Sequence, residues 1–168
     1  MVKWPPAGKA APGPKATGPA EILMVEDSAT DAELALRAFK RSRIANPLKV
    51  IPSGEQALDY LFGTGTFAKR GPARPLLILL DLGLPGMPGL DFLGKIKVDK
   101  RTWDIPVVTL SFTQSAPAIV MCLQRGVAGH LIKPIDLADL ARIIRQLKLR
   151  LTRVPPAAAS TGNASSKG

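Results

Sequence analysis

The stretch LLILLDLGLPGMPG, residues 76–89, places one carboxylate, Asp81, directly after the five apolar residues 76–80. An apolar run of this length is typical of a strand buried in a parallel sheet. Burying an ionised carboxylate without a partner is costly, so the sequence predicts that Asp81 lies at the open end of this strand, beside groups that neutralise it. Those groups are the first indication of function.

Composition narrows the class of protein. The chain has 168 residues, of which 46% are apolar and 21% charged, as expected for one globular domain with its own core. A single Cys excludes an intramolecular disulfide framework and a Cys-rich zinc site, and it favours a reducing cytoplasm. No stretch resembles a signal peptide or reaches the roughly 18 apolar residues of a membrane span, so we expect a cytoplasmic protein without a membrane partner.

The two ends differ in composition from the middle. Residues 1–19 are mostly Pro, Ala, Gly and Lys, and residues 152–168 are mostly Pro, Ala, Ser and Gly. Such segments cannot bury enough apolar surface to fold alone. We therefore expect two disordered tails around a folded domain at 20–151.

Short apolar segments alternate with amphipathic ones along this domain. The segments that we expect to be strands are 20–25, 48–51, 76–82, 107–111 and 130–132. The expected helices begin at Thr30, with Glu33 completing a capping box, and at Ser53, with Gln56 in the same role and an end near Phe62. Three more are expected at 89–98, 115–125 and 136–151. Strict alternation of this kind predicts an α/β fold, with a parallel sheet covered by helices on both faces.

Polar side chains gather at the strand ends. In a doubly wound sheet the ligand site lies beyond the carboxyl ends of the strands, where this sequence has Glu26, Asp27, Asp81, Ser111 and Lys133. Three neighbouring carboxylates repel one another unless a cation shares them. A hard divalent ion, preferably Mg²⁺, suits such oxygen ligands and leaves positions for phosphate oxygens.

Four of these strand ends carry motifs in a specific order. VEDS at 25–28, LLDLGLP at 79–85, VTLS at 108–111 and KP at 133–134 together closely resemble the receiver domain of two-component response regulators, of the chemotaxis type. The spacing agrees, because Asp81 and Ser111 are 30 residues apart and Ser111 and Lys133 are 22 apart. The resemblance covers about 20–151. It implies a flavodoxin-like fold, with five helices and a five-stranded sheet in the order 2-1-3-4-5.

The resemblance also implies a role for each site residue. Asp81 would accept a phosphoryl group from a sensor histidine kinase, with Lys133 pairing with that group. Ser111 would be the hydroxyl that moves toward it. The ligands implied for Mg²⁺ are Glu26, Asp27, Asp81 and the backbone carbonyl of Gly83. The protein would then be a signalling domain rather than an enzyme, with at most self-catalysed phosphorylation and dephosphorylation.

Three positions depart from the family pattern. His130, the only histidine, stands where the family often has an aromatic switch residue, and is either a ring-shaped switch or a strand-end residue without a signalling role. Phe112 is larger than the residue that usually follows the hydroxyl, and its bulk would restrict access to the acyl phosphate or reshape a partner surface. Pro88 replaces an acid that often precedes the Gly, here Gly89, which affects only the loop.

Partners are implied by similarity within the family. The segment YLFGTGTFAKRGPARP, residues 60–75, is similar to the small single-domain regulators paired with bacterial phytochromes. The output would be a protein contact, to a downstream target or a histidine phosphotransfer protein. The surface formed by the fourth helix, fifth strand and fifth helix would serve this contact or a homodimer. On the expected fifth helix, the polar side is made basic by Arg142, Arg145, Lys148 and Arg150.

Two other classes of function have some support. An isoelectric point of about 10.2 and basic tails are compatible with nucleic-acid binding, although the domain lacks a recognition motif and is only 5% aromatic. A phosphatase or phosphotransferase on a similar fold would use Asp81 as its nucleophile. Such enzymes commonly have a second Asp two residues later, and here that position is Gly83.

Overall fold

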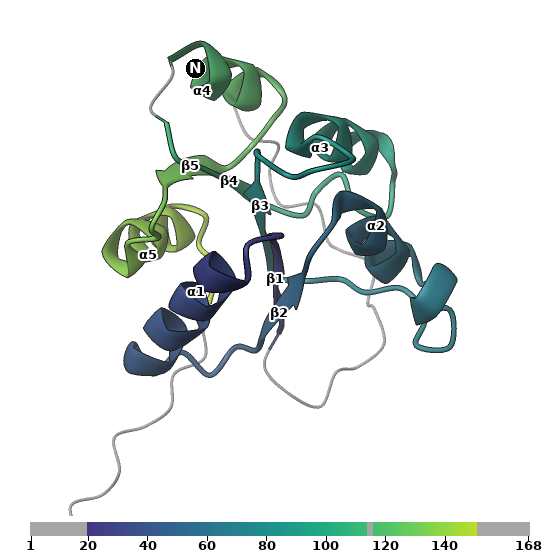
Figure 1. Cartoon of the computed structure of the whole chain (residues 1–168), viewed down its shortest axis with the longest axis horizontal. Helices are drawn as coiled ribbons and strands as arrows, with labels where there is room; N and C mark the ends of the chain where they lie inside the picture. Colours follow the sequence, from purple (N-terminus) through teal and green to yellow (C-terminus); the bar gives the residue numbers. More distant parts are fainter. Residues whose placement is uncertain (1–19, 114–115, 151–168) are drawn as a thin grey trace, which may run out of the picture.

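The computed structural model describes residues 20–113 and 116–150. Five parallel strands form one sheet in the order β2-β1-β3-β4-β5, which confirms the predicted fold and strand order (Figure 1). The strands are β1 (Ile22–Val25), β2 (Leu48–Ile51), β3 (Leu77–Asp81), β4 (Val107–Ser111) and β5 (Gly129–Ile132). The two predicted tails lie outside the described residues.

The strand that ends in Asp81 is the middle strand of the sheet. All five residues of β3 are buried, because β1 and β4 pair with its two edges and helices cover both of its faces. In the register, Val25 lies opposite Leu80, and Asp81 lies opposite Leu110. The residues that follow β1 and β3 therefore come out at the same edge of the sheet.

The helices form a layer on each face of the sheet (Figure 1). On one face lie α1 (Ala29–Arg41) and α5 (Leu137–Gln146), which contribute Phe39, Leu140 and Ile144 to the core. The other face is covered by α2 (Gly54–Phe62), α3 (Gly89–Val98) and α4 (Ala116–Gln124). Each α-helix was expected near its observed position. Among the described residues, no helix is long and apolar enough to cross a membrane.

Helix α1 begins earlier than predicted. Its N-cap is Ser28, whose side chain accepts a hydrogen bond from the Asp31 amide at 3.2 Å, so the expectation that Thr30 caps the helix is wrong. Ser28 is itself fixed, because its amide donates to the Glu26 carboxylate at 3.0 Å. The earlier start makes Asp31 the third residue of the helix. The predicted cap of α2 is confirmed, since the Ser53 side chain accepts from the Gln56 amide at 3.2 Å.

Helix α5 ends earlier than predicted. The apolar periodicity indicated a helix to residue 151, but α5 stops at Gln146 and Lys148 has a positive φ of 55°. The Leu149 amide then bonds back to the Ile144 carbonyl at 3.1 Å, which terminates the helix. As a result, Lys148 and Arg150 do not belong to the basic side of α5, and Arg142 pairs there with Asp139.

The connection between α2 and β3 is long, as the sequence indicated, and contains a short 3₁₀ helix, η1 (Gly65–Phe67). Phe67 packs edge-on against Tyr60, with ring centroids 5.0 Å apart. Arg70 donates a 2.8 Å hydrogen bond to the Tyr60 hydroxyl, which also contacts Glu21. Through these contacts the segment between α2 and β3 packs at the amino ends of the strands, away from Glu26, Asp27 and Asp81.

Candidate functional site

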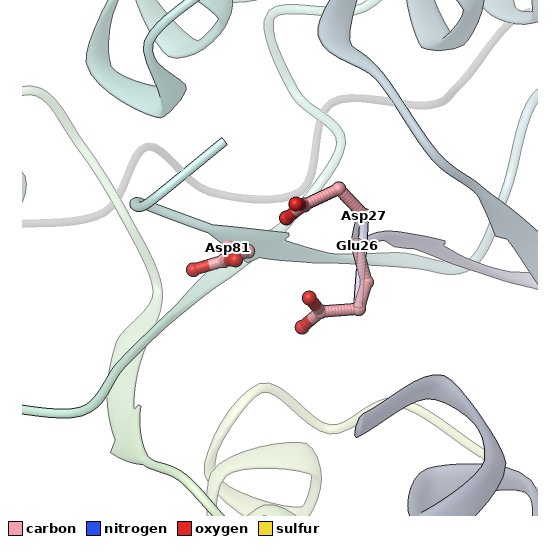
Figure 2. A group of neighbouring side chains, drawn as sticks. All are labelled: Glu26, Asp27 and Asp81. Carbon is pink, nitrogen blue, oxygen red and sulfur yellow. The ribbon is translucent and has the colours of Figure 1, made fainter. Parts of the chain in front are cut away.

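Three carboxylates meet at the carboxyl edge of the sheet (Figure 2). Glu26 and Asp27 directly follow β1, and Asp81 is the last residue of β3. One oxygen of each lies within 4.8 Å of the others. Glu26 and Asp81 are buried, whereas Asp27 is exposed, so the group is open to solvent on one side only. The predicted convergence of these residues is confirmed.

Glu26 is the most enclosed of the three carboxylates. Its Oε1 accepts the hydrogen bond from the Ser28 amide, and its buried Oε2 lies 2.6 Å from the Lys133 ammonium. Burial raises the pKa of Glu26, and the neighbouring Asp81 charge adds to this effect, while Lys133 and the Ser28 amide oppose it. A buried carboxylate of this kind is stabilised by any cation that lies beside it.

Lys133 supplies the positive charge of the site. It follows β5, and its Nζ lies 2.6 Å from Glu26 Oε2, 3.0 Å from Asp31 Oδ2 and 3.1 Å from Asp81 Oδ2. Burial by itself lowers the pKa of Lys133, but its contacts with the three carboxylates outweigh burial and raise the pKa overall. The lysine therefore stays charged and offsets part of the negative charge around Asp81.

The carboxylate of Asp81 is held by its own turn. Its Oδ1 accepts a hydrogen bond from the Gly83 amide at 2.9 Å, and its Oδ2 faces Lys133. Further along, the chain returns so closely that a Cβ on Gly89 would lie 2.6 Å from the Asp81 carbonyl oxygen. Only a glycine fits there without moving the end of β3. Gly83 and Gly89 of the opening stretch thus help to fix the position of the carboxylate.

Ser111 belongs to a chain of hydrogen bonds at the ends of β4 and β5. Its hydroxyl donates to the Thr113 carbonyl at 2.7 Å, and its Oγ lies 3.1 Å from His130 Nε2. On the other side of the ring, Nδ1 lies 2.8 Å from Thr109 Oγ1. A neutral ring with its proton on Nε2 satisfies all three contacts, because Nε2 then donates to Ser111 and Nδ1 accepts from Thr109. Burial lowers the pKa of His130, which favours this neutral form.

Two residues of the site, Asp31 and Thr109, were not foreseen from the sequence, and neither was the contact that Phe112 makes with Lys133. Asp31, on α1, contacts Lys133. Thr109, which lies two residues before Ser111 on β4, contacts His130. The Phe112 ring lies with its centroid 4.7 Å from Lys133 Nζ although 70% of the residue is exposed. Only the four-residue spacing between Asp27 and Asp31, one helical turn, could have indicated any of these contacts.

The donor set fits a hard divalent cation. It consists of carboxylate oxygens from three residues, two of them buried, and the exposed Asp27 leaves one side of the group open to solvent. Mg²⁺ and Mn²⁺ both accept a small number of carboxylates while keeping other positions for water or phosphate. The geometry therefore describes an acidic metal-binding group beside an acceptor carboxylate and a charged lysine.

Comparison with known proteins identifies this arrangement. The family model described as the response regulator receiver domain matches residues 22–145, and the chain belongs to this family. It is therefore a signalling domain of a two-component system, a class whose partner is a histidine kinase, rather than a classical enzyme.

Individual relatives narrow the comparison. A probable methanogenesis regulatory protein, FilR2, from Methanothrix harundinacea is 35% identical over 134 residues, which are 80% of this chain and 84% of that protein. The bacteriophytochrome response regulator RtBRR has a solved structure that is 36% identical, with a TM-score of 0.72, covering 82% of this chain and 84% of that one.

A third relative was solved with a metal. The Mn²⁺-bound structure of the response regulator Rcp1 is 32% identical, with a TM-score of 0.66, covering 82% of this chain and 99% of that one. Rcp1 itself comes from a Synechocystis species. The chain also spans 59% and 62% of the lengths of two Arabidopsis thaliana response regulators, ARR15 and ARR7.

Proposed function

We propose that Asp81 accepts a phosphoryl group from a sensor histidine kinase and that the resulting acyl phosphate is the signal. The observation that carries this proposal is the position of Asp81 at the end of the central strand. There its carboxylate lies beside Lys133 Nζ, at 3.1 Å, and within the group that it forms with Glu26 and Asp27. Family membership supports the same assignment.

The proposed transfer forms one bond and breaks one. A carboxylate oxygen of Asp81 attacks the phosphorus of a phosphohistidine, an O–P bond forms, and the electron pair of the P–N bond returns to the histidine ring. Lys133 stays charged and stabilises the negative charge of the transferring group. Water later hydrolyses the acyl phosphate, which restores the Asp81 carboxylate and releases inorganic phosphate.

We infer that the cation is Mg²⁺ and that it is held by Glu26, Asp27, Asp81 and the backbone carbonyl of Gly83. Glu26, Asp27 and Asp81 supply the converging carboxylates, and the relative Rcp1 was solved with Mn²⁺. When bound, such an ion neutralises carboxylate charge and phosphoryl oxygens. The burial of Glu26 supports the assignment, because a buried carboxylate gains more from a cation than an exposed one does.

Ser111 and His130 are the proposed switch. In this structure the Ser111 hydroxyl is bonded to the Thr113 carbonyl and to the His130 ring. Movement of the hydroxyl toward a phosphorylated Asp81 would break both contacts and release the ring. This change would reach the surface formed by α4, β5 and α5, where Val120 and Leu123 are about half exposed.

That surface is the proposed output of a cytoplasmic regulator. Similarity to the bacteriophytochrome response regulator supports a phytochrome-like kinase as the donor. The surface would bind a downstream target protein, a histidine phosphotransfer protein or a second copy of the chain. In each case the contact would depend on the phosphorylation of Asp81.

A mass measurement tests the assignment of Asp81. The full chain is incubated with Mg²⁺ and acetyl phosphate, and separately with a phosphorylated histidine kinase, before intact mass is recorded. We expect one phosphoryl adduct in the wild type and in Asp91→Asn, a control that removes an exposed carboxylate from the first turn of α3. We expect none in Asp81→Asn. An adduct that survives Asp81→Asn would assign the acceptor to another residue.

A further inference from the structure

Asp31 contributes a fourth carboxylate to the site from outside the strand ends. It lies in the first turn of α1, and its side chain is only 20% exposed. With Lys133 and Glu26 it lines a cavity of about 320 Å³ between α1 and the segment that follows β5. The other residues that line this cavity are mostly apolar. A carboxylate in such surroundings needs a cationic partner, and Lys133 is that partner.

The contact between Asp31 and Lys133 is one of three that the lysine makes with carboxylates. Lys133 Nζ donates a hydrogen bond to Asp31 Oδ2 at 3.0 Å. Glu26 Oε2 is closer, at 2.6 Å, and Asp81 Oδ2 lies at 3.1 Å. Asp31 differs from these two in its place in the fold, because it reaches the ammonium from α1, whereas Glu26 and Asp81 reach it from the ends of β1 and β3.

Asp31 also differs in its relation to the metal-binding group. Glu26 and Asp81 contact Lys133 and belong to the group of converging carboxylates, whereas Asp31 contacts Lys133 and is not a member. A divalent cation in that group would share the charge of Glu26 and Asp81 and so weaken their attraction for the lysine. The charge of Asp31 would remain available to Lys133.

We propose that Asp31 is a positioning residue that retains Lys133 beside Asp81 while Glu26 and Asp81 are engaged by the cation. The proposal rests on the proposed function of Asp81. Without Asp31, the ammonium is balanced by Glu26 and Asp81 alone, and it competes with the cation for both. Loss of Asp31 therefore weakens cation binding and leaves Lys133 less well placed for the transferring phosphoryl group.

A double-mutant cycle on metal affinity tests this role. Mg²⁺ binding to the full chain is measured by calorimetry for the wild type, Asp31→Asn, Lys133→Met and the double variant. We expect Asp31→Asn to weaken Mg²⁺ binding about three- to tenfold when Lys133 is present, and by less than about 1.5-fold in the Lys133→Met background. If Lys133→Met does not fold, Lys133→Gln provides a neutral background of similar length.

A matched control separates positioning from a general charge effect. Glu33→Gln removes one negative charge from the same helix, two residues from Asp31, where the side chain is 61% exposed and pairs with Arg37. We expect it to leave Mg²⁺ affinity within about 1.5-fold of the wild type, because exposed charges are well screened. An equal loss in Glu33→Gln, or an equal effect of Asp31→Asn with and without Lys133, would overturn the proposal.

The rate of phosphorylation provides a second measurement. At saturating Mg²⁺, we expect Asp31→Asn to slow the formation of the acetyl phosphate adduct about fivefold, and Asp31→Glu to recover part of the rate. An unchanged rate in Asp31→Asn would contradict the positioning role. If the wild type forms no adduct, the proposed function of Asp81 fails, while the Mg²⁺ cycle still decides whether Asp31 acts through Lys133.

Discussion

His130 Nε2 lies 3.1 Å from Ser111 Oγ and holds the Ser111 hydroxyl in its bond to the Thr113 carbonyl. The ring is held in turn by Thr109, at 2.8 Å from Nδ1. The pairing of β4 with β5 explains this order, because Thr109 lies opposite His130 and Ser111 lies opposite Ile132. A histidine at this position therefore bonds to the proposed switch hydroxyl, which a phenylalanine cannot do.

Replacing the histidine by phenylalanine should release the hydroxyl. His130→Phe keeps a ring of similar size but removes both hydrogen bonds, and one such bond contributes about 1 kcal/mol. We expect the affinity for beryllofluoride, a phosphoryl analogue that favours the switched state, to rise about fivefold, since 1.4 kcal/mol corresponds to tenfold. The binding is measured by calorimetry with Mg²⁺ present. An equal rise in the Ser111→Ala background would show that the hydroxyl is not involved.

The same residue should make stability depend on pH. Burial lowers the pKa of His130 below 6.5, so between the lowered pKa and 6.5 the native state binds fewer protons than the unfolded state. The free energy of unfolding then rises with pH through this window and falls as the solution is acidified. Asp136, Asp139 and Arg142 of the neighbouring segment line the same surface hollow as His130.

Urea unfolding between pH 5 and pH 8 measures this dependence. The raised pKa of Glu26 also makes stability depend on pH, so the informative quantity is the difference between the wild type and His130→Phe. We expect the wild type to lose more stability than the variant as the pH falls below 6.5. Parallel curves would contradict the lowered pKa.

The sequence predicted the strand-end residues of the site but not the side chains that reach it from elsewhere. Glu26, Asp27, Asp81 and Lys133 could be predicted because parallel strands bring their carboxyl ends to one edge, whatever the register. Asp31 could not, because its direction depends on where α1 begins. With Thr30 as the cap, Asp31 would occupy the first helical position, whereas the observed cap, Ser28, makes it the third.

The contacts of His130 could not be predicted from the sequence, because they depend on the register between β4 and β5. The sequence shows that His130 follows Ser111 by 19 residues, but not which residue of β4 faces it. The register places buried Thr109 opposite the ring, and this neighbour decides which nitrogen carries the proton. Between these neighbours His130 is partly buried.

We expect that any side chain at position 89 disturbs both the fold and the site, because Gly89 lies against the end of β3. A Cβ at this position would lie 2.6 Å from the Asp81 carbonyl oxygen and 2.9 Å from the Leu82 Cα, both of which are backbone atoms. We expect Gly89→Ala to destabilise the protein by about 2 kcal/mol and to slow phosphorylation, because the end of β3 must move. Chemical denaturation and the mass assay measure the two effects.

Gly94 provides the control on the same helix. A Cβ there meets no atom within 4 Å, and the residue lies inside α3. Gly94→Ala should therefore be neutral or stabilise the protein by up to about 1 kcal/mol, through the higher helix propensity of alanine. Similar losses of stability in both variants would indicate that the close approach to Asp81 is not the cause.

Phe112 should control how long the phosphorylated state lasts. Its ring lies 4.7 Å from Lys133 Nζ, and the Lys133 side chain is only 3% exposed although Phe112 itself is 70% exposed. Because the ring buries little of its own surface, we expect Phe112→Ala to change the free energy of unfolding by less than about 0.5 kcal/mol. Removing the ring opens the site to water, so the acyl phosphate of Phe112→Ala should hydrolyse several times faster than that of the wild type.

Phe112→Leu distinguishes two ways in which the ring could act. Leucine keeps much of the bulk but has no π face for the ammonium, an interaction that contributes about 0.5–1 kcal/mol at exposed sites. If the ring acts by excluding water, the lifetime of the adduct in Phe112→Leu stays close to that of the wild type, and this is the result that we expect. The decay of the phosphoryl adduct, followed by intact mass after removal of the donor, measures the lifetime. A leucine variant that decays as fast as Phe112→Ala would assign the effect to the contact between the ring and Lys133.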